Sequence, residues 1–200
     1  MSVSLNKGQS VSLAKKGGGG ITSLHFGLGW DPAEAPKKGL FSKLLSGGAK
    51  SIDLDASCIE CDASGNAIDI CWWKKLDTDD KAIHHTGDNL TGEGDGDDEV
   101  IQVKTDKLNP NTKHLVLTVN SFQGQSFNEV ANAECRVVDM DTNTELCKFS
   151  LSEQGAHTGV VMGIVSLTNE GWVFKAVGSI ANGQTAQDMM GAASAAIASA

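Results

Sequence analysis

The chain has 200 residues, of which 40% are hydrophobic and 20% charged, a composition typical of a soluble globular protein with one domain or one domain and appendages. Its formal net charge of −9 argues against nonspecific binding to nucleic acid, which requires a basic face. It has neither the roughly twenty apolar residues of a membrane span nor an apolar signal core, so we expect a cytoplasmic protein without direct membrane insertion.

The first fifty residues predict short strands followed by a surface excursion. Apolar side chains alternate with His25, Gly27 and Gly29, which indicates a half-buried strand ending at Asp31-Pro32. The apolar positions are Leu24, Phe26, Leu28 and Trp30. Residues 31–51 contain two of the three prolines with several glycines and lysines, and a short helical turn is expected at residues 40–45.

Residues 51–62 (SIDLDASCIECD) return to a β pattern. A period of two places Ile52 and Leu54 on one face and Asp53 and Asp55 on the other. Two carboxylates on one face repel each other unless they share a cation, so these aspartates are candidate metal ligands. A turn over residues 62–66 and apolar residues from 68 to 72 then predict a hairpin.

Residues 87–99 (GDNLTGEGDGDDE) combine six carboxylates with four glycines. They supply −6 of the −9 net charge and leave −3 for the rest of the chain. Ca²⁺ binds roughly six to eight oxygen ligands in a flexible geometry, and glycines permit the sharp turns that bring such ligands together. The alternative without a metal is an acidic loop that is exposed to solvent. The β pattern directly after Glu99 favours a loop that belongs to the folded domain.

Two familiar loop motifs do not fit this segment. Asp88 and Glu99 stand at positions 1 and 12 of an EF-hand, but Leu90, Gly92 and Glu93 occupy positions that need Asp or Asn, Asp or Asn, and Gly. A phosphate-binding loop is excluded because Gly-Lys-Ser/Thr is missing and the carboxylates would repel phosphate.

The rest of the chain predicts an all-β fold. Six β segments separated by turn residues indicate a β-sandwich of two mainly antiparallel sheets. They are residues 100–105, 115–121, 131–140, 146–151, 160–167 and 172–177. We expect a domain of residues 1–184, followed by an Ala-rich C-terminal helix or tail at residues 185–200.

The remaining side chains favour structural roles. Cys58 and Cys61 form a C-x-x-C pair, but it lies within a β pattern and lacks a second pair at zinc spacing, so buried core cysteines are expected. Five cysteines cannot all pair, which fits a reducing compartment. His84 and His85 are expected to be a solvated pair, although His85 could instead orient the acidic loop.

Several segments resemble the TerD family of bacterial tellurium-resistance and stress-response proteins. The similarity runs from the N-terminus to about residue 180 and is most specific in the acidic loop. The segments are GLGWD (27–31), IDLDAS (52–57), HTGDNLTGEGDGDDEVIQV (85–103), FNEVANAECRVVD (127–139) and TELCKFSLSE (144–153).

The resemblance implies a calcium-binding β-sandwich without enzymatic activity, which acts with sister Ter proteins and is recruited to the inner membrane by a membrane-protein partner. Two bound Ca²⁺ ions would change the net charge from −9 to −5. Asp31 is a weaker candidate ligand. The implied ligands are Asp53, Asp55, Asp88, Asn89, Glu93, Asp95, Asp97, Asp98 and Glu99.

The sequence departs from the family pattern in the longer and more basic residues 32–50, in Cys58, Cys61 and Cys71, and in the Ala-rich tail. Two alternative functions remain at this point. Clustered carboxylates could hold the metal of a hydrolase, although no separate general base or nucleophile is evident. A sandwich could also bind a small molecule such as a cyclic nucleotide, although no basic cradle for a phosphate is evident.

Overall fold

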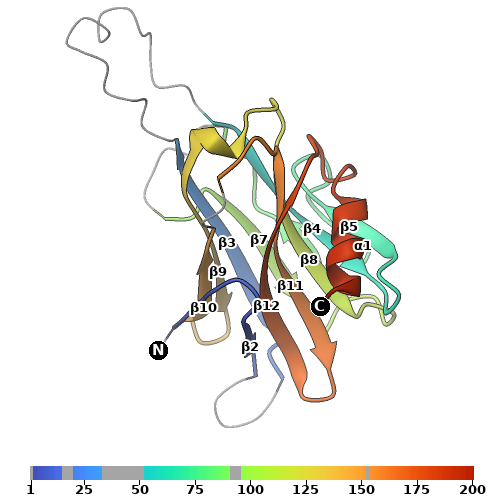
Figure 1. Cartoon of the computed structure of the whole chain (residues 1–200). Coiled ribbons are helices and arrows are strands. Elements are labelled where there is room, and N and C mark those ends of the chain that lie inside the picture. Colours follow the sequence, from blue (N-terminus) through green and yellow to red (C-terminus); the bar gives the residue numbers. More distant parts are fainter. Residues whose placement is uncertain (1, 15–19, 33–51, 91–95, 152–153) are drawn as a thin grey trace, which may run out of the picture.

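The computed structural model describes residues 2–14, 20–32, 52–90, 96–151 and 154–200. The predicted turn at residues 40–45 lies outside them. Two six-stranded sheets form the two layers of a β-sandwich (Figure 1). The first sheet has the order β1 (Val3–Leu5), β10 (Thr144–Ser150), β9 (Val130–Asp139), β3 (Ser23–Pro32), β7 (Glu99–Lys104) and β6 (Ile83–His85). The second has the order β2 (Ser10–Ser12), β12 (Gly171–Ala181), β11 (Gly159–Thr168), β8 (His114–Ser121), β4 (Leu54–Cys61) and β5 (Ala67–Cys71).

The strand pairings confirm the β-sandwich predicted from the alternation. Among the described strands, all pairs are antiparallel except β1 with β10. The hairpin of β4 and β5 forms as expected around the turn at residues 62–66. Strand β3 ends at Asp31-Pro32 as predicted, and both residues pair with β9 after a local irregularity of register. A short 3-10 helix, η2 (Phe127–Glu129), precedes β9.

Apolar side chains fill the space between the two sheets. Leu24, Phe26, Leu28 and Trp30 of β3 all belong to this core, and the residues between them, which face outward, are His25, Gly27 and Gly29. Small residues on that outer face leave room for the acidic loop, which lies against it. The alternation that predicted a half-buried strand therefore also created the surface on which the loop rests.

The C-terminal helix α1 (Met190–Ala198) covers the outer face of the second sheet (Figure 1). Ala193 and Ala196 pack with Ile59 and Ile164 in a second, smaller apolar cluster. The helix is shorter than the Ala-rich segment, because residues 185–188 form a turn stabilised by the Asp188 carboxylate. No helix in the described part of the chain has the length and apolar character needed to cross a membrane.

The five cysteines are buried free thiols. Cys58 faces the core between the sheets, whereas Cys61 faces the cluster under α1. The C-x-x-C pair therefore points to opposite sides of β4, as the period of an extended strand dictates. This arrangement confirms the prediction of core cysteines.

Candidate metal site

Three aspartates from two segments of the chain meet at one point of the molecule. Asp53 immediately precedes β4, Asp55 lies within β4, and Asp88 lies in the loop after β6. One carboxylate oxygen of each lies within 4.8 Å of the other two. Asp53 and Asp55 are buried and Asp88 is exposed, so the cluster extends from the interior to solvent.

Two side-chain amides from the end of β8 and the following loop hold the buried aspartates. Pairing of β4 with β8 places Asn120 opposite Asp55, and the Asn120 Nδ2 group donates to Asp55 Oδ2 at 3.1 Å. The same Nδ2 group donates to the Gln184 carbonyl at 2.9 Å, which ties the segment before α1 to the site. Gln123 Nε2 donates to Asp53 Oδ2 at 3.2 Å.

One oxygen of this cluster lacks a protein partner. Among the described residues, none forms a hydrogen bond with Asp53 Oδ1, although the oxygen is buried and the residue is only 4% exposed. Burying a carboxylate oxygen without a partner is costly, and such groups in proteins are normally paired or coordinate a metal. The Asp53 Oδ1 atom is therefore a buried acceptor to which a bound cation could supply the balancing charge.

The electrostatics of the cluster favour the addition of positive charge. The pKa of Asp55 is raised to about 8, first by burial and then by the negative charges of Glu99, Asp53 and Asp88, which together outweigh the lowering by the Asn120 hydrogen bond. Burial also raises the pKa of Asp53, with a contribution from Asp88. A bound cation would offset both the burial and the repulsion.

Glu99 lies beside the cluster and binds two backbone segments. Its Oε2 accepts hydrogen bonds from Ala56 N–H at 2.7 Å and from His85 Nε2 at 3.3 Å. Its Oε1 accepts one from Asn89 N–H at 3.2 Å. His85 and Glu99 side chains are both 0% exposed. The expectation of a solvated His84–His85 pair was therefore wrong for His85, which turns inward from the edge strand β6, while His84 is exposed and pairs with Asp77.

Asp97 is held elsewhere, on the outer face of the first sheet. Arg136 of β9 binds it with Nε at 2.6 Å and Nη2 at 2.8 Å, and His25 Nε2 lies 2.8 Å from its Oδ2. Burial acts to raise the pKa of Asp97, but the hydrogen bonds and charges of His25 and Arg136 outweigh it and lower the pKa to about 2. Asp97 thus anchors the loop to the sheet.

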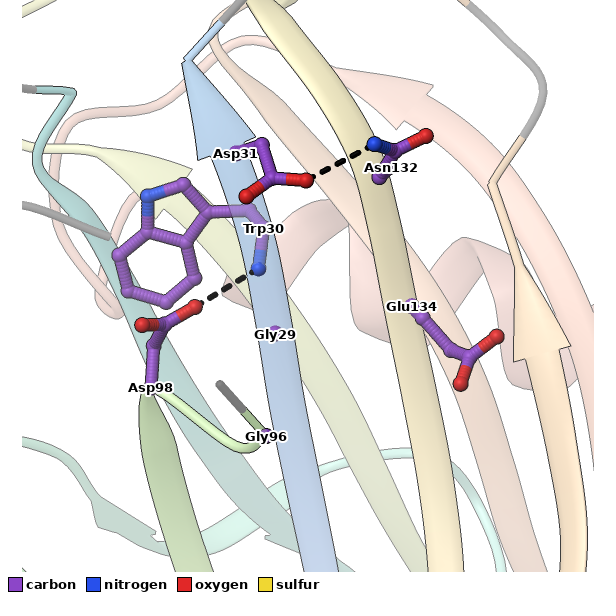
Figure 2. Close-up of a pocket in the computed structure, with 7 residues that line it drawn as sticks. All are labelled: Gly29, Trp30, Asp31, Gly96, Asp98, Asn132 and Glu134. Carbon is purple, nitrogen blue, oxygen red and sulfur yellow. Dashed lines mark hydrogen bonds between the residues drawn. The ribbon is translucent and has the colours of Figure 1, made fainter. Parts of the chain in front are cut away.

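Asp98 lines an open depression of about 390 Å³ on this side of the molecule, with Asp31 and Glu134 nearby (Figure 2). Its Oδ2 accepts a hydrogen bond from Trp30 N–H at 2.8 Å, and its Oδ1 accepts one from Asn89 Nδ2 at 2.9 Å. Asp31 in turn accepts from Asn132 at 2.8 Å (Figure 2). Asp53, Asp55 and Asp88 are not among the residues that line this depression.

The structure thus divides the residues predicted from the sequence into groups. Asp53, Asp55 and Asp88 come together, Glu99 and Asn89 join the loop to the sandwich, and Asp97 and Asp98 bind β3 and β9. Glu93 and Asp95 lie outside the described residues.

Sequence reasoning missed the residues that support these acids. They are His25, Gly27, Asn120, Gln123 and Arg136. Only one of them carried a usable signal: glycines alternating on the outer face of β3 suggest that another segment lies close to it.

Comparison with known proteins shows consistent similarities. The family model for the TerD domain matches residues 1–190. Tellurium resistance protein TerZ of Serratia marcescens is 52% identical over 187 residues, 94% of each chain. Stress response protein SCP2 of Bacillus subtilis (strain 168) is 37% identical over 198 residues, covering 95% of this chain and 98% of the relative. A solved structure of a telluride resistance protein (TerD) homologue from Streptomyces coelicolor A3(2) matches in fold, with a TM-score of 0.64 at 18% identity, over 82% of this chain and 92% of that one.

Proposed function

Because the chain belongs to the TerD family of tellurium-resistance and stress-response proteins, we propose that it is a non-enzymatic calcium-binding module in such a response. In this proposal Asp53, Asp55 and Asp88 provide the protein ligands of one Ca²⁺ ion. The observation that carries it is the buried, unpartnered Asp53 Oδ1 atom within a cluster of three carboxylates.

The chemistry of the cluster favours a hard cation. All three side chains offer oxygen, whereas zinc sites are built mainly from cysteine and histidine. Ca²⁺ accepts irregular sets of six to eight oxygens, while Mg²⁺ demands near-ideal octahedral geometry and keeps several waters. Asp88 is exposed, so water can fill the remaining positions on the solvent side. The second ion expected from the sequence stays a prediction.

The cation would change how the chain meets its partners. Neutralising the cluster removes the repulsion between Asp88 of the loop and the aspartates at β4, which favours one position of this part of the loop. Sister Ter proteins, with a membrane-protein partner, are the proposed binding partners. No residue of the cluster is needed as a nucleophile or base in this role.

Calorimetric titration and thermal melting test the proposal. A ligand that binds only the folded state stabilises it by about 2.7 kcal/mol at one hundred times its Kd. The melting temperature should therefore be highest with Ca²⁺, lower with Mg²⁺ and lowest with a chelator. Equal melting temperatures with Ca²⁺ and chelator would refute calcium binding, and calcium-dependent turnover in a phosphoesterase panel would favour the hydrolase alternative.

A further inference from the structure

We propose that His85 is a positioning residue of the cation site, acting through Glu99 to set the separation between the Asp55 and Asp88 carboxylates. The inference rests on the proposed function, because it concerns the same site. It starts from an arrangement that the family resemblance does not supply: a single buried carboxylate that holds the backbone beside both ligands.

Glu99 bridges the two segments that carry the ligands. Its Oε2 accepts from the N–H of Ala56, the residue after Asp55, and its Oε1 accepts from the N–H of Asn89, the residue after Asp88. The two oxygens of one carboxylate are a fixed distance apart. The carboxylate therefore fixes how far the loop backbone lies from the strand, and with it the space between the ligands.

His85 fixes the orientation of this carboxylate. The Gly87 N–H can only donate, and it lies 3.2 Å from His85 Nδ1, so Nδ1 is the acceptor and Nε2 carries the hydrogen. That hydrogen points to Glu99 Oε2 at 3.3 Å. Hydrogen bonds behind the ligands of a metal site commonly fix their orientation, and losing one typically lowers metal affinity about 10–100-fold.

The arrangement connects the loop at two successive points. Gly87 and Asn89 flank Asp88, and their N–H groups reach His85 and Glu99 respectively. Asp88 is thus held from both sides even though its own side chain is exposed. Loosening this support should lower the affinity for calcium more than the affinity for magnesium. Calcium is the larger ion, and its site depends on several protein oxygens that are held in position.

Three substitutions of His85 separate positioning from mere stability. His85→Leu removes both hydrogen bonds, and His85→Gln keeps an N–H donor at the distance of Nε2. His85→Asn keeps an acceptor near Gly87, but its shorter side chain places no donor at the position of Nε2. Thr112→Val is the matched control. It removes a buried hydrogen bond to Glu60, farther along the same strand β4, and leaves His85 and Glu99 intact.

The measurements are the calcium Kd, the ratio of magnesium to calcium Kd, and the luminescence lifetime of bound Tb³⁺ in H₂O and D₂O. The lifetime reports how many water molecules coordinate the ion. We expect His85→Leu and His85→Asn to raise the calcium Kd at least about tenfold and to admit more water to bound Tb³⁺. His85→Gln should restore much of the affinity, and Thr112→Val should lower the melting temperature without changing Kd or hydration.

The outcomes are distinguishable. Wild-type protein that binds neither Ca²⁺ nor Tb³⁺ overturns the proposed function and this inference together. Wild-type binding with an unchanged Kd and unchanged Tb³⁺ hydration in His85→Leu overturns the inference alone. Equal losses in His85→Leu and Thr112→Val would show that affinity follows stability, and that also overturns it.

Discussion

Asp97 lies directly over Gly27, so close that a Cβ atom on Gly27 would overlap with the Asp97 carboxylate. The missing side chain lets the carboxylate reach Arg136 and His25 across the outer face of β3. The glycine and the salt bridge are thus parts of one anchor, which fixes the acidic loop to the outer face of the first sheet.

Gly27→Ala should therefore disrupt the salt bridge between Asp97 and Arg136, although it changes neither residue. The new methyl group displaces Asp97 from Arg136, and we expect a loss of about 1–3 kcal/mol in the free energy of unfolding. Denaturant titration of Gly27→Ala, Arg136→Gln and the double variant tests the link. The double variant should lose much less than the sum of the single losses, whereas strict additivity would show that the two residues act independently.

The anchor also predicts a pH dependence. The pKa of Asp97 is lowered to about 2 in the folded protein, below the value of about 3.9 for a free aspartate. Its contribution is therefore fully present above pH 4 and lost as the pH falls through about 2. At pH 7 the free energy of unfolding of Arg136→Gln should be about 1–2 kcal/mol lower than that of wild type. The loss is small because Arg136 is partly exposed and solvent screens the ion pair. The difference should shrink below pH 4. A difference that stays constant from pH 7 to pH 2.5 would contradict this account.

Asp55→Asn should separate calcium binding from stability. The substitution removes a proposed ligand, so the calcium Kd should rise more than about tenfold. In chelator the variant should be as stable as wild type or more stable, because burial and neighbouring acids disfavour the Asp55 charge. Calorimetry and melting curves measure both effects. Asp106 is an exposed turn residue, so Asp106→Asn controls for the change in net charge. If Asp55→Asn binds calcium with the affinity of wild type, Asp55 is not a ligand.

The thiols should be unreactive in the folded protein. All five cysteines are buried, and burial raises the pKa of Cys61, Cys71 and Cys147 to about 12. Thiolates are the reactive species, so a thiol reagent at pH 8 should modify none of them rapidly in buffer and all five in denaturant. Rapid labelling in buffer would reveal local opening of the sandwich.

Partner binding should depend on calcium. If the cation fixes the loop beside β4, purified sister Ter proteins should bind wild-type protein in Ca²⁺ more strongly than in chelator. Asp55→Asn should show weak binding in both conditions, and Asp106→Asn should behave like wild type. Equal binding in Ca²⁺ and chelator would show that the ion does not control partner binding and at most stabilises the fold.

The strands could be predicted from the sequence because the alternation of apolar with polar or small residues follows the burial of alternate side chains, as in Leu24 to Trp30 of β3. The meeting of Asp53 and Asp55 with Asp88 was also anticipated, since like charges on one strand face and in a nearby loop need a shared counterion. The contacts of Asp97 and Glu99 could not be predicted from the sequence. Their partners Arg136 and Ala56 lie 39 and 43 residues away, and a backbone N–H donor leaves no signature in the side-chain pattern.

The contact between Asn120 and Gln184 has a consequence for protein synthesis. Gln184 is made 129 residues after Asp55 (184 − 55), a delay of roughly 6–26 s at about 5–20 residues per second. Until then Asn120 lacks one of its two acceptors, so the amide that binds Asp55 is held less firmly. A nascent chain that has not yet reached Gln184 should therefore bind calcium more weakly than the folded domain, and full affinity should develop only after this segment has been made.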